Sequence, residues 1–217
     1  MNVVKLSTVK LDRAKVVTTA LALLDEVGLD RLTLRRLAAE LGVQAPALYW
    51  HFANKQELLD EMADALSREI PLRPLAEGEP WQNWLAERMR DQRRMLNSHR
   101  DAARLFVGAR PGPSALPILQ VALESLGRAG FLPREALRGL FTLSNYVSGF
   151  VLEEQAKPVR EPQEELNEAN RWFAGHPSLL ETFAESGPPQ GEETFEHGLS
   201  VILEGMRVLL SSSPDPR

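Results

Sequence analysis

Apolar residues recur three and four positions apart along almost all of the 217-residue chain. This is the spacing at which side chains share one face of an α-helix. Within residues 12–27, for example, one apolar stripe is formed by Val16, Ala20, Leu23, Leu24 and Val27. No segment alternates apolar and polar residues in the manner of a half-buried strand. The sequence therefore predicts an all-α protein.

Polar capping residues and glycines divide this pattern into separate helices. Asp12, Thr33 and Asn54 each precede a periodic run, where a side-chain oxygen can accept a free N–H group of the first turn. Gly28 and Gly42 are suited to ending a helix. The expected helices cover residues 12–27, 33–42, 45–51, 54–70, 81–98, 101–109, 114–129, 133–155 and 191–211.

The clearest break in the chain is PLRPLAEGEP, residues 71–80, which holds three prolines and one glycine. It predicts two units, a compact helical unit over residues 1–70 and a larger helical body over residues 71–217. Within the body, the Pro- and Glu-rich stretch 156–190 is expected to hold only short helices among loops.

Charge is unevenly distributed between these two units. The net charge of −5 at first sight argues against a nucleic-acid partner. Residues 1–56, however, carry eight Lys/Arg against five Asp/Glu, whereas the rest of the chain carries 17 against 25. A basic N-terminal unit on an acidic body is expected when only the first meets a polyanion, although a difference of this size also arises by chance.

The residue content excludes several classes of protein. The absence of cysteine excludes disulfides and thiolate metal sites and suits a reducing cytoplasm. The four histidines are too scattered for an HExxH motif, and the chain has no nucleophile elbow, phosphate-binding loop or metal pair. No apolar run approaches the roughly 18–20 residues that span a bilayer, and the N-terminus lacks a secretory signal. We therefore expect a cytoplasmic, non-enzymatic protein with no metal, no cofactor and no membrane contact.

Two short helices around LTLRRLAAELGVQAPALYWHF have the form of a helix-turn-helix. The first has a buried face of Leu34, Leu37, Ala38 and Leu41. Gly42 permits a sharp bend, and Val43 and Leu48 can pack back into the angle. The second helix is too short to be stable alone and must be supported by its neighbours. A helix supported in this way can project its N-terminal residues into a DNA major groove.

Four rings in a row follow on this second helix. Leu48 and Phe52 are expected in the core, but Tyr49, Trp50 and His51 are too close together for all to face inward. Exposed rings beside Lys55 at the next helix start would provide donors to phosphate oxygens. The alternative is an aromatic core within a small helical domain.

The segment TLRRLAAELGVQAPALYWHFANKQELLD closely resembles the DNA-binding head of the tetracycline-repressor (TetR) family, from Leu11 through Asp60. The resemblance implies that the first motif helix meets the DNA backbone through Thr33, Arg35 and Arg36, with Arg35 also reaching a guanine edge. It implies that the base-reading start of the recognition helix is Ala45, Pro46 and Ala47. It places the phosphate contacts on Tyr49, Trp50, His51 and Lys55.

The tetracycline repressors themselves carry Gln at the position of Ala45 and Thr at that of Ala47. Alanine can touch a thymine methyl group but cannot make the bidentate amide contact to adenine. The resemblance therefore predicts a different operator, read more by Arg35 and by apolar contacts.

The resemblance continues more weakly through the body, in GEPWQNWL, HRDAARLFVGARP, SGFVLEEQ and FEHGLSVILEGM. In the tetracycline repressors the body binds magnesium-tetracycline, and the imidazole that holds the metal falls here on Phe106. Glu153 matches the carboxylate that helps to hold the hydrated metal. The drug contacts fall on the unlike residues Arg88, Gln92, Ala109 and Ala122. Without the imidazole, magnesium-tetracycline is not the expected ligand.

A small-molecule cavity is nevertheless expected, because the helices that would wall it keep their landmarks. The expected ligand-binding residues are Trp84, Arg88, Gln92, Phe106, Ala109, Leu137, Leu140, Ser144, Asn145 and Glu153. This mixture is mostly apolar with a few polar anchors, as in most small-molecule pockets. If Arg88 and Glu153 both face the cavity, they could pair with each other or fix a polar or anionic ligand. A salt bridge with no ligand role is the alternative.

The helices near 133–155 and 191–211 carry long apolar faces, formed by Leu137, Leu140, Leu143, Val147, Val151, Phe195, Leu199, Ile202, Met206 and Leu209. By resemblance these helices build a four-helix bundle across a two-fold axis. The sequence thus predicts a homodimeric repressor that binds a palindromic double-stranded operator and is released by a small-molecule effector. A TetR-type activator and an effector-blind DNA-binding regulator are the alternatives.

Overall fold

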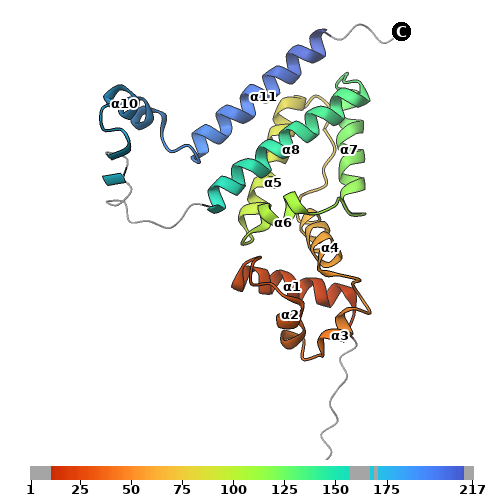
Figure 1. Cartoon of the computed structure of the whole chain (residues 1–217). Coiled ribbons are helices and arrows are strands. Elements are labelled where there is room, and N and C mark those ends of the chain that lie inside the picture. Colours follow the sequence, from red (N-terminus) through yellow and green to blue (C-terminus); the bar gives the residue numbers. More distant parts are fainter. Residues whose placement is uncertain (1–10, 157–166, 169–170, 213–217) are drawn as a thin grey trace, which may run out of the picture.

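The computed structural model describes residues 11–156, 167–168 and 171–212, and all regular structure within those ranges is helical (Figure 1). The all-α prediction is therefore confirmed. Figure 1 shows a small helical head at one end and a larger helical body at the other. Across the described ranges, none of the helices has the length and apolarity required to cross a membrane.

The head consists of α1 (Arg13–Val27), α2 (Leu34–Glu40), α3 (Ala45–Leu48) and α4 (Lys55–Ser67). All three predicted N-caps are confirmed. Asp12 accepts a hydrogen bond from the Lys15 backbone N–H at 2.7 Å, Thr33 accepts from Arg36, and Asn54 accepts from Glu57. Each cap satisfies one N–H group that the first helical turn leaves free.

Helix α3 is shorter than predicted. It ends at Leu48 rather than at His51, because the chain turns there and both His51 and Phe52 donate their backbone N–H groups to the Leu48 carbonyl. The turn brings Phe52 into the core, where only 1% of the residue is exposed. Before α3, Gly42 adopts φ +67° and Val43 donates to the Ala38 carbonyl, which makes the sharp bend between α2 and α3.

The body consists of α5 (Trp81–Asn97), α6 (Ala102–Gly108), α7 (Ala115–Arg128), α8 (Pro133–Ala156) and α11 (Glu192–Ser212). Helix α8 is central and packs against each of the other four. The predicted helix bounds are confirmed to within two residues. Helix α10 (Pro177–Ser186) stands away from the body and buries none of its residues (Figure 1).

Helix α4 runs from the head into the body, and it packs on both α1 and α6 (Figure 1). At a second junction, the Leu29 backbone N–H donates to Asp101 at 2.8 Å, and Arg104 forms an ion pair with Asp30 at 2.8 Å. Gly28 lies at φ +78°, and a Cβ atom there would come within 2.8 Å of the Asp101 carboxylate. The body therefore packs directly against the end of α1 at a position that only glycine fits.

One contiguous cluster of buried apolar residues runs through both units, from Val16 in α1 to Met206 in α11. The Pro-rich stretch 71–80 is non-helical as predicted, and its Arg73 carbonyl accepts a hydrogen bond from the Trp84 indole at 3.1 Å. The division into domains 1–70 and 71–217 stays a prediction.

Candidate DNA-binding surface and effector cavity

The four rings near α3 divide between core and surface. Leu48 and Phe52 are buried, whereas Tyr49 is 56% exposed and Trp50 is 89% exposed. His51 is half-buried. An indole exposed to this degree contributes nothing to the protein's own core, and its position just after α3 makes it available to a partner.

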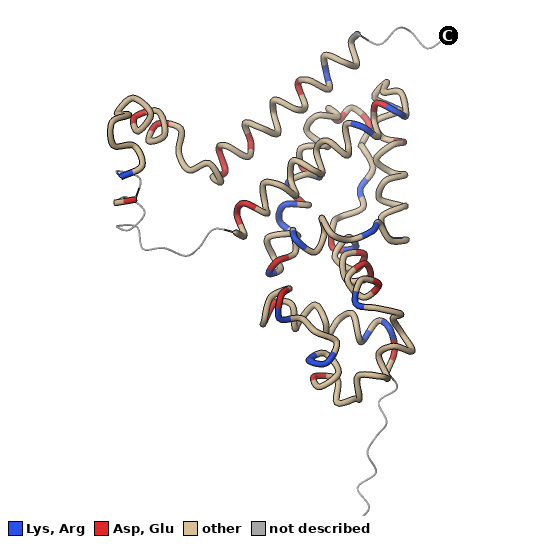
Figure 2. Tube along the Cα trace, viewed as in Figure 1, with Lys and Arg blue, Asp and Glu red and all other residues tan. Residues whose placement is uncertain are grey.

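The polar candidates lie on the same part of the head. Thr33 and Arg36 are exposed at the start of α2, with the Arg36 guanidinium 3.8 Å from Glu26. Arg35 is exposed and forms no ion pair with a described residue. Lys55 is half-buried as the first residue of α4, where the helix dipole favours an anion. Figure 2 shows how Lys and Arg positions are distributed over the head and the body.

The predicted base-reading residues form the N-terminal half of α3. Pro46 is exposed, and Ala45 and Ala47 are half-buried. Pro46 occupies the first turn, where its missing N–H group costs nothing, and no side chain caps this helix. The first turn therefore presents small apolar groups and free backbone N–H groups rather than long polar side chains.

A contact that sequence reasoning missed fixes the orientation of α3 relative to α4. Arg13 of α1 donates to the His51 carbonyl and forms ion pairs with Glu57, at 2.9 Å, and Glu61. Its guanidinium also lies 4.6 Å from the centre of the Phe52 ring. These partners are separated from Arg13 by 38 to 48 residues, so the fold alone brings them together.

The body contains a cavity of about 440 Å³, bordered by α4, α5, α6, α7 and α8 and by the loop after α6. Seven of the ten predicted ligand-binding residues line it, namely Arg88, Gln92, Phe106, Ala109, Leu140, Ser144 and Asn145. Residues that were not predicted to line it complete the wall, including Asp64 and Ser67 of α4 and Met89, Leu119 and Phe141.

Three predicted lining residues do not border this cavity. Trp84 is fully buried, and its indole is committed to the Arg73 carbonyl. Leu137 is half-buried elsewhere on α8, and Glu153 is exposed near the end of that helix. The condition for a pairing of Arg88 with Glu153, that both face the cavity, is not met, and no ion pair of either residue exists within the described part of the chain.

The polar part of the cavity wall centres on Arg88 and Gln92, one turn apart on α5. The Gln92 amide donates to the Ser144 hydroxyl at 3.0 Å and to the Ser148 hydroxyl at 3.4 Å. Arg88 is only 7% exposed, and its Nε and Nη1 atoms are buried without a hydrogen-bond partner. Burial lowers the pKa of Arg88 from its usual value.

One wall of the cavity is joined to α4. Asp64 accepts hydrogen bonds from the Ser114 backbone N–H and hydroxyl, both at 2.7 Å, and from Arg68 at 3.0 Å. Burial would raise the pKa of Asp64, but these hydrogen bonds outweigh it and lower the pKa. Nearer the head, Asp60 accepts from the Arg110 backbone N–H at 3.0 Å. If α4 moves, the loop after α6 must therefore move with it, or these hydrogen bonds must break.

The residues that line the cavity differ from the metal-binding set that the resemblance implies. The position of the metal-binding imidazole is taken by Phe106, whose ring cannot coordinate a cation, and Glu153 lies outside the cavity. In the part of the chain that the structure describes, no cluster of three or more His, Cys, Asp or Glu side chains is placed to hold a metal.

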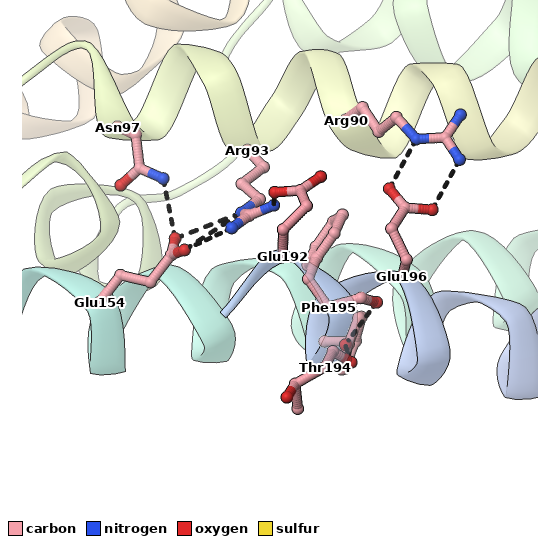
Figure 3. A network of polar contacts seen from close by, with 9 residues as sticks. Arg90, Arg93, Asn97, Glu154, Glu192, Thr194, Phe195 and Glu196 are labelled. Carbon is pink, nitrogen blue, oxygen red and sulfur yellow. Dashed lines mark hydrogen bonds and ion pairs between the residues drawn. The ribbon is translucent and has the colours of Figure 1, made fainter. Parts of the chain in front are cut away.

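Most residues of the apolar faces predicted for dimerisation are buried by packing within the single chain. Buried residues of these faces are Leu140, Leu143, Val147, Val151, Phe195, Leu199 and Met206. Charged contacts also hold α11 to the body (Figure 3): Arg90 pairs with Glu196 at 2.7 Å, and Arg93 bridges Glu154 of α8 and Glu192 of α11. The apolar residues that remain exposed on α8 and α11 include Phe141, Val201 and Val208.

Comparison with known proteins is consistent with this geometry along the whole chain. The family model described as "Bacterial regulatory proteins, tetR family" matches residues 16–62, and the model "Tetracyclin repressor-like, C-terminal domain" matches residues 73–210. The class A tetracycline repressor from transposon 1721 of Escherichia coli is 37% identical over 218 residues, which covers 96% of this chain and 97% of the relative.

Two solved structures are similar over nearly their full length. ActR of Streptomyces coelicolor in complex with actinorhodin has a TM-score of 0.82 and 28% identity, and the match covers 93% of this chain and 99% of that one. BioQ with its double-stranded DNA operator has a TM-score of 0.66 and 27% identity, covering 92% and 99%. The chain therefore belongs to the tetR family of bacterial regulatory proteins, and it is a DNA-binding transcriptional regulator rather than an enzyme.

Proposed function

We propose that the protein is a homodimeric cytoplasmic repressor that binds a palindromic operator with two heads and leaves it when a small molecule enters the body. The observation that carries the proposal is the path of α4. This helix begins at the candidate phosphate contact Lys55 and ends in the cavity wall at Ser67. One rigid helix thus belongs to both candidate sites.

The proposed release mechanism has two states. In one, the loop after α6 holds α4 through Asp60 and Asp64, and the two heads of a dimer lie at the spacing of successive major grooves, about 34–36 Å. A ligand that fills the cavity between α4, α5 and α7 favours a second arrangement of this loop and α4. The ligand shifts the balance only as far as its affinities for the two states differ.

In the DNA-bound state, we assign base contacts to Arg35 and to the apolar start of α3, Ala45 to Ala47. The phosphate contacts are assigned to Thr33, Arg36, Tyr49, Trp50, His51 and Lys55. The exposure of Trp50 and Tyr49 and the support that Leu48 and Phe52 give from beneath favour this assignment. The named relatives favour it too, because one is a repressor and another is solved on its operator.

The effector is not magnesium-tetracycline in this proposal. Phe106 replaces the metal ligand, and no other side chain of the cavity wall takes over its role. The ActR complex with actinorhodin shows that a protein of this fold takes a different kind of ligand.

The test has two stages. Fragments of genomic DNA that the dimer binds are first selected and sequenced, and a palindromic consensus is expected. Affinity for that consensus is then measured with a library of small molecules. At least one compound should weaken DNA binding at least tenfold and should lose this effect when the cavity is filled by Ala122→Phe. Selection of no common sequence would contradict the proposal.

A promoter-reporter assay with the selected DNA separates the remaining alternatives. Repression that a ligand relieves agrees with the proposal. Ligand-dependent increase above the protein-free level identifies an activator, and expression that no compound changes identifies an effector-blind regulator.

A further inference from the structure

Arg88 is a buried cation that forms no ion pair with any described residue. The residue is 7% exposed, and two of its three guanidinium nitrogens are buried with no hydrogen-bond partner. Its guanidinium carbon lies 5.2 Å from the centroid of the Trp84 ring. A guanidinium stays protonated at physiological pH even when burial opposes it, so the charge itself is present.

Asp91 attracts Arg88 electrostatically without forming an ion pair with it, and both Asp91 and Asp64 are paired with other arginines. Asp91, one turn along α5, forms an ion pair with Arg94. Asp64, which shares the cavity wall with Arg88, accepts from Ser114 and pairs with Arg68. A buried charge without a direct ion pair destabilises a protein, so such a residue is usually retained for a purpose other than stability.

The space beside Arg88 has the character of a ligand site. The cavity of about 440 Å³ lies within the usual range for small-molecule pockets. Apolar side chains make up most of its wall, including Met89, Phe106, Leu119 and Leu140. Gln92, one turn from Arg88 on α5, supplies an amide group, and Ser144 of α8 supplies a hydroxyl group. A molecule that enters would meet apolar surface over most of its length and a cation at one point.

We propose that the effector is an apolar compound with a carboxylate group, and that Arg88 binds this carboxylate through a charge-assisted hydrogen bond. The proposal rests on the proposed function, since it names the ligand class of the same cavity. The fork of a guanidinium matches the two oxygens of a carboxylate and can form two parallel N–H···O bonds with it. Arg88 thus selects for the acid, and the apolar wall provides most of the binding energy.

The test uses pairs of aromatic carboxylic acids and their primary amides, from 2-naphthoic acid to 1-pyrenebutyric acid, with the full-length protein in titration calorimetry at pH 7.5. For the acids that bind, we expect affinity at least about tenfold above that of the matched amide, as a hydrogen bond to a charged group provides. Arg88→Met should remove the difference, and Arg134→Met, at an exposed arginine outside the cavity, should retain it.

Equal affinity for acid and amide, binding of none of the acids, or a preference that survives in Arg88→Met would overturn the proposal. A second measurement needs no ligand. Arg88→Met should raise the thermal unfolding midpoint by several degrees, because it removes an unpaired buried charge and keeps the length of the side chain. A lower midpoint would instead make Arg88 a structural residue.

DNA binding distinguishes this inference from the proposed function. If amides release the selected DNA as well as acids do, the protein is a ligand-responsive regulator and the carboxylate assignment fails. If acids bind through Arg88 but no compound changes DNA affinity, the carboxylate site remains and the proposed function fails.

Discussion

The Asp25 carboxylate near the end of α1 lies 3.0 Å from Nδ1 of His99, in the turn between α5 and α6. The other ring nitrogen, Nε2, lies 3.3 Å from Glu69, just after α4. His99 thus contacts acids from two segments of the N-terminal unit, and together with Asp101 and Arg104 it forms the polar junction between head and body.

We expect His99 to titrate above its ordinary pKa of 6.5. Burial lowers the pKa, but the hydrogen bonds and charges of Asp25 and Glu69 outweigh burial and raise it. A raised folded-state pKa means that this contact stabilises the protein fully below pH 6.5 and loses its contribution as the pH rises through the folded value. Histidine NMR titration checks this. Asp25→Asn should lower the pKa of His99, and an unchanged value would contradict the role of Asp25.

Trp50 and Leu48 should respond oppositely to alanine substitution. Because Trp50 is 89% exposed, Trp50→Ala should change the free energy of unfolding by less than about 0.5 kcal/mol, but it should weaken DNA binding. Leu48 is fully buried beneath α3, so Leu48→Ala should cost about 2–5 kcal/mol. Urea unfolding and DNA titration measure the two effects. If Trp50→Ala left DNA affinity unchanged, the indole would not belong to the DNA surface.

Lys55 and Arg35 should separate phosphate contacts from base contacts. Lys55→Ala should weaken binding to all DNA sequences and reduce the slope of log affinity against log salt by about 1. Arg35→Ala should in addition relax sequence preference, with about 1–3 kcal/mol less discrimination at one base pair. The measurement is affinity for the selected operator and its single-base variants across a salt series. Identical behaviour of the two variants would refute the assignment.

The helices were predictable because their signals are local. Asp12, Thr33 and Asn54 cap helices that begin one residue later, and a cap needs only its own first turn. The spacing of these residues along the chain likewise indicated that Leu48 and Phe52 are buried and that neighbouring rings such as Trp50 are exposed. The contact between Asp64 and Ser114 could not be predicted, because it joins residues 50 positions apart whose meeting depends on how α4, α6 and α7 pack.

The cavity was predicted only in part, for a related physical reason. The resemblance indicated which helices surround it, and residues such as Gln92 and Ser144 do face it. Helical position alone did not show that Trp84 turns toward the Arg73 carbonyl or that Glu153 lies beyond the cavity end of α8. The lack of a hydrogen-bond partner for two Arg88 nitrogens among the described residues is a property of the packed body, and no sequence pattern reports it.

Gly198 should be intolerant of alanine because α11 crosses α8 closely there. An added Cβ would come within 2.3 Å of the Tyr146 hydroxyl, which donates to the Phe195 carbonyl at 2.9 Å. Gly198→Ala should therefore cost about 1–3 kcal/mol, even though alanine favours helices. Gly127→Ala in α7 is the control, since open space surrounds that position, and it should gain up to about 1 kcal/mol. Thermal unfolding measures the stability of both variants. Equal gains in stability would show that α11 can move away from α8 to accommodate the added methyl group.

Val201 should be essential for the proposed dimer. It is 58% exposed on α11, and Val208 lies two turns further along the same face with Gly205 between them. A partner helix can approach closely at Gly205, where an added Cβ would meet no atom within 4 Å. An aspartate at Val201 would place a charge in the centre of that contact, and its desolvation opposes association.

Val201→Asp should therefore convert a dimer into monomers in sedimentation experiments, with little change in helix content. Affinity for the full palindrome should fall to that for a half-site, because a monomer engages only one major groove. Leu72→Asp is the matched control, since Leu72 is 52% exposed in the loop before α5 and lies on neither helix. If both variants stayed dimeric and retained full affinity, the subunits would meet through another surface, and the exposed face of α11 would need a different partner.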